Sequence, residues 1–319
     1  MKPKILIIRF SALGDILMCT PLIRCLHLQM KAEIYFLTKK SNAVILKENP
    51  HIHQIIVLTD LWQTLHLLRN EHFDLIVDLH KNLRSFFFRF FLGCHAPVVS
   101  YPKYTFRRYL SIHLHQKQWL PKSHVCDRYF KAVKKYKVHN DGLGMEYYNF
   151  APEKSLPLSM QQICQSSSNP YLIIAIGSRH ATKQMPIKKI VFLCQNIPFP
   201  ILLVGDKNDQ AKALSIQKQI SKEDSSTPVW NMCGLLSFDQ TATLVLHANL
   251  IISGDSALMH LSAALQKDLI SVWGSTVPEL GMYPYYPMGS EAVHTLFENK
   301  NLRCRPCHKH GYDRCPKKH

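Results

Sequence analysis

Two short segments near opposite ends of the chain carry the residue types that an enzyme site needs. The first, S-A-L-G-D at residues 11–15, follows an apolar run and opens a helical pattern. Ser11 offers a hydroxyl, Gly14 permits a tight turn or a close ligand, and Asp15 falls at a helix N-terminus. A carboxylate at that position either caps the helix or accepts a proton from a substrate hydroxyl as a general base. The residues alone leave both interpretations of Asp15 open.

The second segment, G-D-S-A-L-M-H at residues 254–260, repeats this strand–loop–helix pattern. The backbone N–H groups of Asp255, Ser256 and Ala257 at the start of a helix predict an anion site. His260 lies one turn beyond Ser256 and either faces the same pocket or packs in the core. Ligands of open α/β sheets bind at the carboxyl ends of the strands, so one acidic loop in each half predicts a cleft between two domains. This pattern favours an enzyme over a scaffold.

A basic loop, G-S-R-H-A-T-K at residues 177–183, follows the first predicted strand of the second half. Ser178 and Thr182 offer hydroxyls, and Arg179 and Lys183 offer cationic donors. This collection suits a phosphate group. A solvated basic loop without a ligand is the alternative.

Arg84 begins a strongly aromatic stretch that continues to residue 91. The phenylalanines of this stretch predict a core helix, and a surface that touches lipid head groups and acyl chains is the alternative. A second aromatic and basic run at residues 101–109 contains Arg107 and Arg108.

The ten cysteines fall into two groups. Seven are scattered, several of them in apolar elements where a reduced cysteine behaves as a small hydrophobic residue. Cys304, Cys307 and Cys315, together with His308 and His310, have a spacing typical of metal ligands. Because no second C-x-x-C pair exists, a structural zinc ion and free thiols near a mobile tail both remain open.

The elements that must position these residues alternate between strand and helix. The predicted strands span residues 4–10, 33–37, 54–58, 73–79, 97–101, 171–176, 201–205, 229–232, 250–253 and 269–273. The predicted helices span residues 15–28, 61–71, 127–137, 187–196, 209–220, 237–247 and 257–265. Such alternation indicates parallel sheets built from βαβ units. A stretch rich in Gly, Pro and Ser at residues 139–170 interrupts it, so we expect α/β domains at 1–150 and 151–300 and a Cys/His-rich tail at 301–319.

Composition and charge restrict the class of protein. The 319 residues exceed one typical core, and 46% of them are hydrophobic, as in an ordinary globular protein. The formal net charge is +17, of which residues 1–150 contribute +12 (22 Lys and Arg against 10 Asp and Glu). A basic excess favours anionic partners, such as nucleic acid, acidic lipid or phosphorylated sugar. The sequence lacks both a signal-peptide pattern and an apolar run long enough to span a bilayer, which predicts a cytoplasmic protein.

Taken together, the motifs resemble glycosyltransferase family 9, the ADP-heptose:lipopolysaccharide heptosyltransferases. The similarity extends from residue 4 to about residue 280 and includes the C-terminal C-R-P-C-H-K-H-G segment. The matching motifs are F-S-A-L-G-D-I-L-M-C-T-P (10–21), D-L-H-K-N-L-R-S (78–85), T-K (182–183), L-V-G (203–205), C-G-L (233–235) and G-D-S-A-L-M-H-L-S-A-A (254–264).

The resemblance implies a GT-B fold, in which two Rossmann-like domains with doubly wound parallel sheets face each other across a cleft. It implies acceptor binding mainly by the first domain, with Ser11, Gly14 and Arg84 on the acceptor side. Asp15 matches the family's proposed general base. The second domain is then expected to bind the nucleotide sugar.

On the donor side, Lys183 beside Thr182 matches the family's phosphate-binding lysine. Asp255, Ser256 and Ala257, with His260, match the loop that holds the donor pyrophosphate. Ser178 falls where a donor-contacting hydroxyl is expected, and Asp209 falls near the acidic residue that holds the ribose. The chain departs from the family pattern at Met185, where Trp is usual, and at Ala257, where Gly is common.

The resemblance further implies an inverting transfer from an ADP-sugar, ADP-heptose above all, to a phosphorylated lipopolysaccharide or lipid-linked acceptor. Protein cations replace a metal ion in this chemistry. We expect no nucleic-acid partner, and we expect peripheral contact with an anionic membrane, at the inner face of the inner membrane, through Arg107, Arg108 and nearby aromatic residues. The alternatives are a GT-B transferase with another nucleotide sugar and glycan acceptor, a basic nucleic-acid-binding protein, and a donor-binding relic without turnover.

Overall fold

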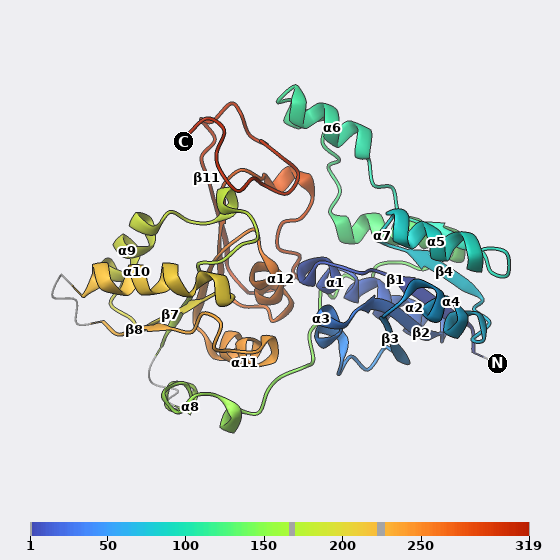
Figure 1. The fold of residues 1–319 in the computed structure, drawn as a ribbon, viewed down its shortest axis with the longest axis horizontal. Coiled ribbons are helices and arrows are strands. Elements are labelled where there is room, and N and C mark those ends of the chain that lie inside the picture. Colours follow the sequence, from blue (N-terminus) through green and yellow to red (C-terminus); the bar gives the residue numbers. More distant parts are fainter. Residues whose placement is uncertain (1, 166–169, 222–226, 319) are drawn as a thin grey trace. The chain divides into compact units, whose positions relative to one another are not determined.

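The computed structural model describes residues 2–165, 170–221 and 227–318. Contacts divide the chain into two compact units. Unit 1 comprises residues 1–104, 123–149 and 285–289, and unit 2 comprises residues 105–122, 150–284 and 290–319. Figure 1 shows the elements of both units.

Unit 1 contains a five-stranded parallel sheet in the order β3-β2-β1-β4-β5. Its strands are β1 (Lys4–Ile8), β2 (Glu33–Lys39), β3 (Gln54–Leu58), β4 (Leu75–Asp78) and β5 (Val98–Ser100). Its helices are α1 (Leu13–Leu17), α2 (Thr20–Met30), α3 (Lys40–Ala43), α4 (Leu61–Arg69), α5 (Leu83–Leu92) and α7 (Val125–Val133). Because β1 pairs with both β2 and β4, the loops that follow these three strands leave the same edge of the sheet.

The helices of unit 1 cover the sheet in two groups. Leu6 and Ile8 of β1 join a buried cluster with side chains of α4 and α5, which also pack against each other. The helix α2 contacts β2 and α7 instead. Successive residues of a strand point to opposite faces, so one strand supplies both layers of core.

Unit 2 contains a six-stranded parallel sheet in the order β11-β10-β9-β6-β7-β8. Its strands are β6 (Leu172–Ala175), β7 (Ile201–Val204), β8 (Val229–Asn231), β9 (Leu250–Gly254), β10 (Leu269–Trp273) and β11 (His294–Glu298). Its helices are α6 (Thr105–His113), α8 (Leu158–Gln165), α9 (Ile187–Asn196), α10 (Gln210–Ile220), α11 (Phe238–His247) and α12 (Ala257–Ala264). The prediction of two parallel α/β sheets is therefore confirmed.

Several elements differ from the prediction, which also lacked α3 and α8. The single helix expected at residues 15–28 is two helices, α1 and α2, that meet near Cys19. Pro21 lies in the first turn of α2, and its ring would clash with the carbonyl four residues earlier in a continuous helix. The strand β11 was not predicted, because its mostly exposed side chains lack the apolar run of a buried strand.

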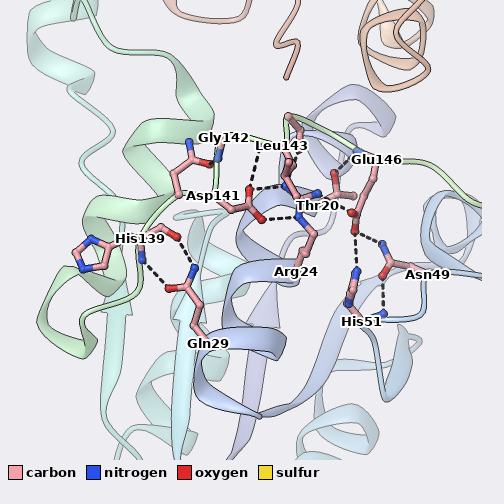
Figure 2. A network of polar contacts seen from close by, with 12 residues as sticks. Thr20, Arg24, Gln29, Asn49, His51, His139, Asp141, Gly142, Leu143 and Glu146 are labelled. Carbon is pink, nitrogen blue, oxygen red and sulfur yellow. Dashed lines mark hydrogen bonds and ion pairs between the residues drawn. The ribbon is translucent and has the colours of Figure 1, made fainter. Parts of the chain in front are cut away.

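A buried arginine anchors the segment at residues 141–146 of unit 1 to α2 (Figure 2). Arg24 donates through Nε and Nη2 to Asp141 at 2.7 and 2.8 Å, and through Nη1 to Glu146 at 2.5 Å. The backbone N–H of Glu146 donates to Thr20 Oγ1 at 3.0 Å. Because α2 directly follows α1, this network ties the segment to the helix pair that carries Asp15.

No helix in the described part of the chain has both the length and the apolar character needed to cross a membrane.

Candidate active site

The acidic loop of unit 1 is organised around an ion pair between Arg9 and Asp15. Arg9 Nη2 lies 2.6 Å from Asp15 Oδ1, while Asp15 Oδ2 accepts the backbone N–H of Ala12 at 2.9 Å. Arg9 also donates through Nε to the carbonyl of Ser11 and through Nη1 to the carbonyl of Leu79. The buried guanidinium therefore fixes the carboxylate of Asp15 and the backbone of the loop together.

Burial lowers the pKa of the Arg9 guanidinium, but the Asp15 carboxylate raises it, and the resulting pKa lies well above the ordinary value. Arg9 is therefore a permanent positive charge beside Asp15. Gly14 is buried within α1. Ser11 takes part through its backbone carbonyl, which accepts the hydrogen bond from Arg9 Nε. The structure thus brings Ser11, Gly14 and Asp15 together on one short loop and helix.

The neighbouring loop, after β4, contacts this site through His80. The His80 ring lies 5.0 Å from the Phe10 ring, measured between centroids. Burial, followed by the positive charges of Arg9 and Lys103, lowers the pKa of His80 to about 4. The imidazole is therefore neutral at pH 7, and it provides a polar group without charge near Asp15.

Asp78 holds the loop that leads to Arg84. Its fully buried carboxylate accepts the backbone N–H groups of His80 and Lys81 and the hydroxyl of Ser85 at 2.8 to 2.9 Å. Asn82 then caps α5, which begins at Leu83. Asp78 therefore acts here as a structural residue that sets where α5 starts.

Arg84 is exposed and lines a pocket of about 500 Å³ in unit 1. The pocket lies beside the carboxyl ends of β2 and β3 and contains two further cations, Lys39 and Lys40, and one carboxylate, Asp60. Asp60 caps α4 by accepting the N–H groups of Trp62 and Gln63. The pocket is therefore suited to an anionic group.

In unit 2, Lys183 and Asp255 form the centre of the second candidate site. Lys183 Nζ lies 2.7 Å from Asp255 Oδ2, and Thr276 Oγ1 donates to the same oxygen at 2.9 Å. The loops that carry these three residues follow β6, β9 and β10, which are neighbours in the sheet. A Cβ on Gly254 would come within 2.8 Å of the Lys183 carbonyl, so glycine permits this close approach.

The helix α12 begins beside this ion pair. Ser256 is its N-cap residue, but the Ser256 side chain makes no capping hydrogen bond and instead contacts Ser253 Oγ at 3.0 Å. The N–H groups of the first turn, from Ala257 onward, therefore donate no hydrogen bond to the cap side chain, and such groups can bind anions. His260 is buried within the same helix.

Ser178 and Asp209 lie near the same edge of the sheet in different environments. Ser178 is half-buried, and its carbonyl accepts a bond from Gln184. Asp209 is buried against Gly177 and Gly205, and its Oδ2 accepts the backbone N–H of Asp206 at 2.9 Å. Burial raises the pKa of the Asp209 carboxyl. Asp209 therefore shapes the turn before α10.

The C-terminal tail packs directly on the loop that carries Lys183. Thr182 Oγ1 donates to the carbonyl of Tyr312 at 2.9 Å, and the N–H of Tyr312 lies 2.7 Å from the same hydroxyl. The N–H of Thr182 donates to that carbonyl at 3.0 Å. Gly311 has a φ of +95°, and a Cβ at this position would come within 3.0 Å of the side chains of His180 and Lys183. The tail therefore braces the basic loop at Thr182, one residue before Lys183.

Arg305 anchors the tail itself. This buried guanidinium donates to the carbonyls of Gly274, Asn299, Trp273 and Thr276, and Nη1 pairs with Glu298 at 3.0 Å. The N–H of Cys307 donates to the carbonyl of Ser275. Both the tail and the loop after β10 are therefore held around one arginine.

The cysteines of the tail do not form a metal centre in the described residues, where no group of three or more His, Cys, Asp or Glu side chains is placed to hold an ion. Cys304 and Cys307 Sγ lie 3.9 Å apart, and none of the ten cysteines, all of which lie in the described residues, forms a disulfide. Burial, followed by the neighbouring Cys304, raises the pKa of Cys307 to about 11. The described residues thus give no support for a structural zinc at Cys304, Cys307 and Cys315, one of the two alternatives that the sequence left open.

Sequence analysis missed several residues of both sites: Arg9, His80, Ser275, Thr276 and Arg305. Arg9 ends an apolar run and resembles a strand residue, although it directly precedes the S-A-L-G-D motif. The sequence did contain a signal for Ser275 and Thr276, because G-S-T follows the strand at 269–273. Polar loops at the carboxyl ends of neighbouring parallel strands meet at one edge, so these residues could have been added to the site.

Comparisons with known proteins place these observations in context. A family model described as glycosyltransferase family 9 (heptosyltransferase) matches residues 61–312. Lipooligosaccharide heptosyltransferase 2 of Haemophilus ducreyi is 25% identical over 318 residues, which cover 86% of this chain and 84% of that protein.

Two solved structures share the fold. ADP-heptose lps heptosyltransferase II of E. coli superimposes with a TM-score of 0.70 at 19% identity, covering 97% of this chain and 92% of that one. E. coli heptosyltransferase WaaC with ADP gives a TM-score of 0.66 at 16% identity, covering 92% and 93%. The predicted GT-B fold class is confirmed by these similarities.

Proposed function

This chain belongs to glycosyltransferase family 9, and from that premise we propose that it transfers a heptose or related sugar from an ADP-sugar to a lipopolysaccharide core acceptor. The observation that carries the proposal is the cluster of Lys183, Asp255 and Thr276 beside the start of α12. A fixed ammonium group and helix N–H groups together suit a diphosphate. The choice of donor and acceptor is supported by the names of similar proteins, which contain the terms ADP-heptose, heptosyltransferase and lipooligosaccharide.

The proposed reaction is a single displacement that inverts the anomeric carbon. An acceptor hydroxyl transfers its proton to the carboxylate of Asp15, and its oxygen attacks the anomeric carbon of the donor sugar. The bond between that carbon and the diphosphate oxygen breaks, and the electron pair leaves with ADP. Arg9 keeps the Asp15 carboxylate in one orientation, so one oxygen can face the acceptor.

Departure of ADP creates negative charge on the diphosphate. The Lys183 ammonium group has three N–H bonds, so it can keep its contact with Asp255 and also donate to a phosphate oxygen. The N–H groups of Ser256 and Ala257 add neutral donors. We propose that His260, which lies in the same helix, belongs to this donor site. In this mechanism protein groups supply the stabilisation that a metal ion gives in other transferases.

The remaining candidate residues take supporting roles in the proposal. Ser178 and Thr182 belong to the donor loop, and Asp209 shapes the turn where the ribose would bind. On the acceptor side, we assign Ser11 and Gly14 to the loop and helix that hold Asp15, and Arg84 offers its charge to a phosphate of the acceptor. A phosphorylated, lipid-linked acceptor would bring the enzyme into contact with an anionic membrane at the inner face of the inner membrane.

A screen of nucleotide sugars tests the donor assignment. We expect ADP and ADP-heptose to raise the melting temperature of the protein more than UDP- or GDP-sugars do, since ligands that bind the folded state stabilise it. The matched variant is Lys183→Met, which should lose most of the shift when its melting temperature with ligand is compared with its own melting temperature without ligand. A larger shift with another nucleotide would instead support a transferase with a different donor.

A transfer assay tests the chemistry. We expect product of inverted anomeric configuration from ADP-heptose and a heptose-deficient lipopolysaccharide core, with a rate that EDTA leaves unchanged. A product of retained configuration, or a rate abolished by EDTA and restored by a divalent ion, would contradict the proposed mechanism.

A further inference from the structure

The helices α4 and α5 present an exposed aromatic surface on unit 1. Trp62 is 61% exposed, Leu83 89%, Phe86 57% and Phe90 62%. We call these four side chains the aromatic face. Large exposed apolar groups that gather in one place mark an interaction site more often than an accident of folding.

The core of unit 1 does not account for this surface. Phe88 and Leu92 point inward and join the buried cluster with Leu6 and Ile8. Phe86 and Phe90 are one turn apart on the outer side of the same helix. The sequence analysis predicted that the phenylalanines at residues 86–91 form a core helix, and this is wrong for Phe86 and Phe90.

The rings of this region are packed against each other. Trp62 contacts Phe87 and Phe91 at centroid distances of 5.0 and 5.4 Å, and Phe90 contacts Phe91 at 5.2 Å. Phe87 and Phe91 also pack against the buried cluster. The aromatic face therefore stands on a layer of half-buried rings and is already formed in the isolated chain.

Most of the charges around the aromatic face are positive. The helices α4 and α5 contain Arg69, Arg84 and Arg89 and no acidic residue. Lys39 and Lys40 join Arg84 around the adjacent pocket, where Asp60 is the one carboxylate. Aromatic rings bordered by arginine and lysine are the combination that binds the interface of an anionic bilayer.

We propose that the aromatic face docks unit 1 on an anionic phospholipid bilayer. This inference deepens the proposed function, on which it rests for the lipid-linked nature of the acceptor. The rings enter the head-group region, while Arg84, Lys39 and Lys40 pair with lipid phosphates. The face differs from the surface around Arg107 and Arg108 of α6 that the sequence suggested.

Co-sedimentation of the full chain with vesicles tests the proposal without donor or acceptor. We expect binding to vesicles that contain phosphatidylglycerol and little binding to pure phosphatidylcholine. The double variant Phe86→Ser with Phe90→Ser should weaken binding about tenfold or more, because two large apolar groups no longer enter the bilayer. Arg84→Gln should weaken binding at low salt and have less effect at high salt.

Two controls show whether the effect belongs to this face. Phe192→Ser removes a 60% exposed ring of α9 in unit 2 and should leave vesicle binding unchanged. Phe106→Ser removes a 71% exposed ring of α6 beside Arg107 and should also have little effect. Quenching of Trp62 fluorescence by brominated lipid, lost in Trp62→Phe, should show that the face enters the bilayer.

Several results would overturn the proposal. One is failure of the wild type to bind anionic vesicles at low salt, and another is loss of binding in Phe106→Ser but not in the double variant. A change from dimer to monomer in the double variant, measured by sedimentation, would assign the face to a second copy of the chain. Failure of the nucleotide screen alone would reject the proposed donor and leave vesicle binding intact, so the two proposals are tested separately.

Discussion

Asp15 and Asp255 each pair with one cation of their own unit, at 2.6 and 2.7 Å. The surroundings of the two pairs differ. Besides its pair with Asp15, Arg9 donates to the carbonyls of Ser11 and Leu79, so its guanidinium holds the loop in place. Lys183 has one carboxylate contact and lies beside the start of α12. The first pair is therefore suited to orient a base, and the second to bind an anion.

The substitution Asp15→Asn tests the residue that we propose as the base. The amide keeps the size of the side chain but cannot accept the hydroxyl proton, so we expect kcat to fall by about 10²-fold or more. The thermal shift caused by ADP should remain near that of the wild type, because Asp15 is not in the proposed donor site. Steady-state kinetics and melting curves measure the two quantities. Near-full turnover in Asp15→Asn would reject the assignment.

The residues that carry motifs were found from the sequence, whereas the residues that support them were not. Asp15, Lys183 and Asp255 stand in short patterns next to predicted strands. Thr276 was missed although the G-S-T segment gave a signal for it, and Arg9 was missed because the end of an apolar strand does not show that its side chain pairs with Asp15. The contact of the Asp209 carboxylate with the Asp206 N–H was not predicted either.

At the scale of elements, the C-terminal tail holds the loop at residues 177–183 through hydrogen bonds between Tyr312 and Thr182. The substitution Thr182→Val removes the hydroxyl that bonds to the backbone of Tyr312 and to Ser275 Oγ. We expect the dissociation constant for ADP to rise about fivefold, since the lost hydrogen bonds are exposed or only partly buried and together contribute about 1 kcal/mol. Isothermal titration calorimetry measures this dissociation constant. The control is Thr295→Val, on exposed β11, which should bind ADP like the wild type. Equal affinities of the two variants for ADP would show that the tail does not position Lys183.

The network around Arg24 gives a prediction about stability and pH. Hydrogen bonds from Arg24 lower the pKa of the Asp141 carboxyl from 3.8 to about 2. A lowered pKa in the folded state means that the network stabilises unit 1 above about pH 4, and that this contribution is lost as the pH falls from about 4 to about 2.

We therefore expect Arg24→Met to reduce the free energy of unfolding at pH 7 by about 3 kcal/mol, because Asp141 and Glu146 remain without their cation. The same variant should lose the part of the pH dependence that arises between pH 4 and 2. Denaturant unfolding at several pH values measures both effects. Lys47→Met, which breaks an exposed pair with Glu48, should change stability by less than about 0.5 kcal/mol. An equal effect of the two substitutions would contradict this account.

At the scale of elements, the alternation of strands and helices was sufficient to predict both parallel sheets. The break between α1 and α2 could have been predicted from Pro21, which stands within the assumed helix. The outward position of Phe86 and Phe90 could not have been predicted, because the hydrophobic pattern of a helix that is aromatic on several sides does not show which side is buried.

At the scale of the whole molecule, the net charge of +17 makes nucleic acid an alternative partner that binding experiments can test. We expect single-stranded oligonucleotides to bind only non-specifically, with a dissociation constant weaker than about 1 µM at physiological salt. Fluorescence anisotropy between 0.05 and 0.2 M salt measures this affinity and its salt dependence. The double variant of the aromatic face should bind oligonucleotides like the wild type. Nanomolar, sequence-dependent binding would favour the nucleic-acid alternative.

The contact between Thr182 and Tyr312 also sets an order of events during synthesis of the chain. The two residues are 130 positions apart, which a ribosome covers in about 7 to 26 s at 5–20 residues per second. Throughout that interval the strands of unit 2 are being completed while the loop before Lys183 lacks its brace. Nucleotide present in the cell therefore meets a finished donor site only after the tail has emerged, and a nascent chain stalled before residue 312 should be unable to retain ADP.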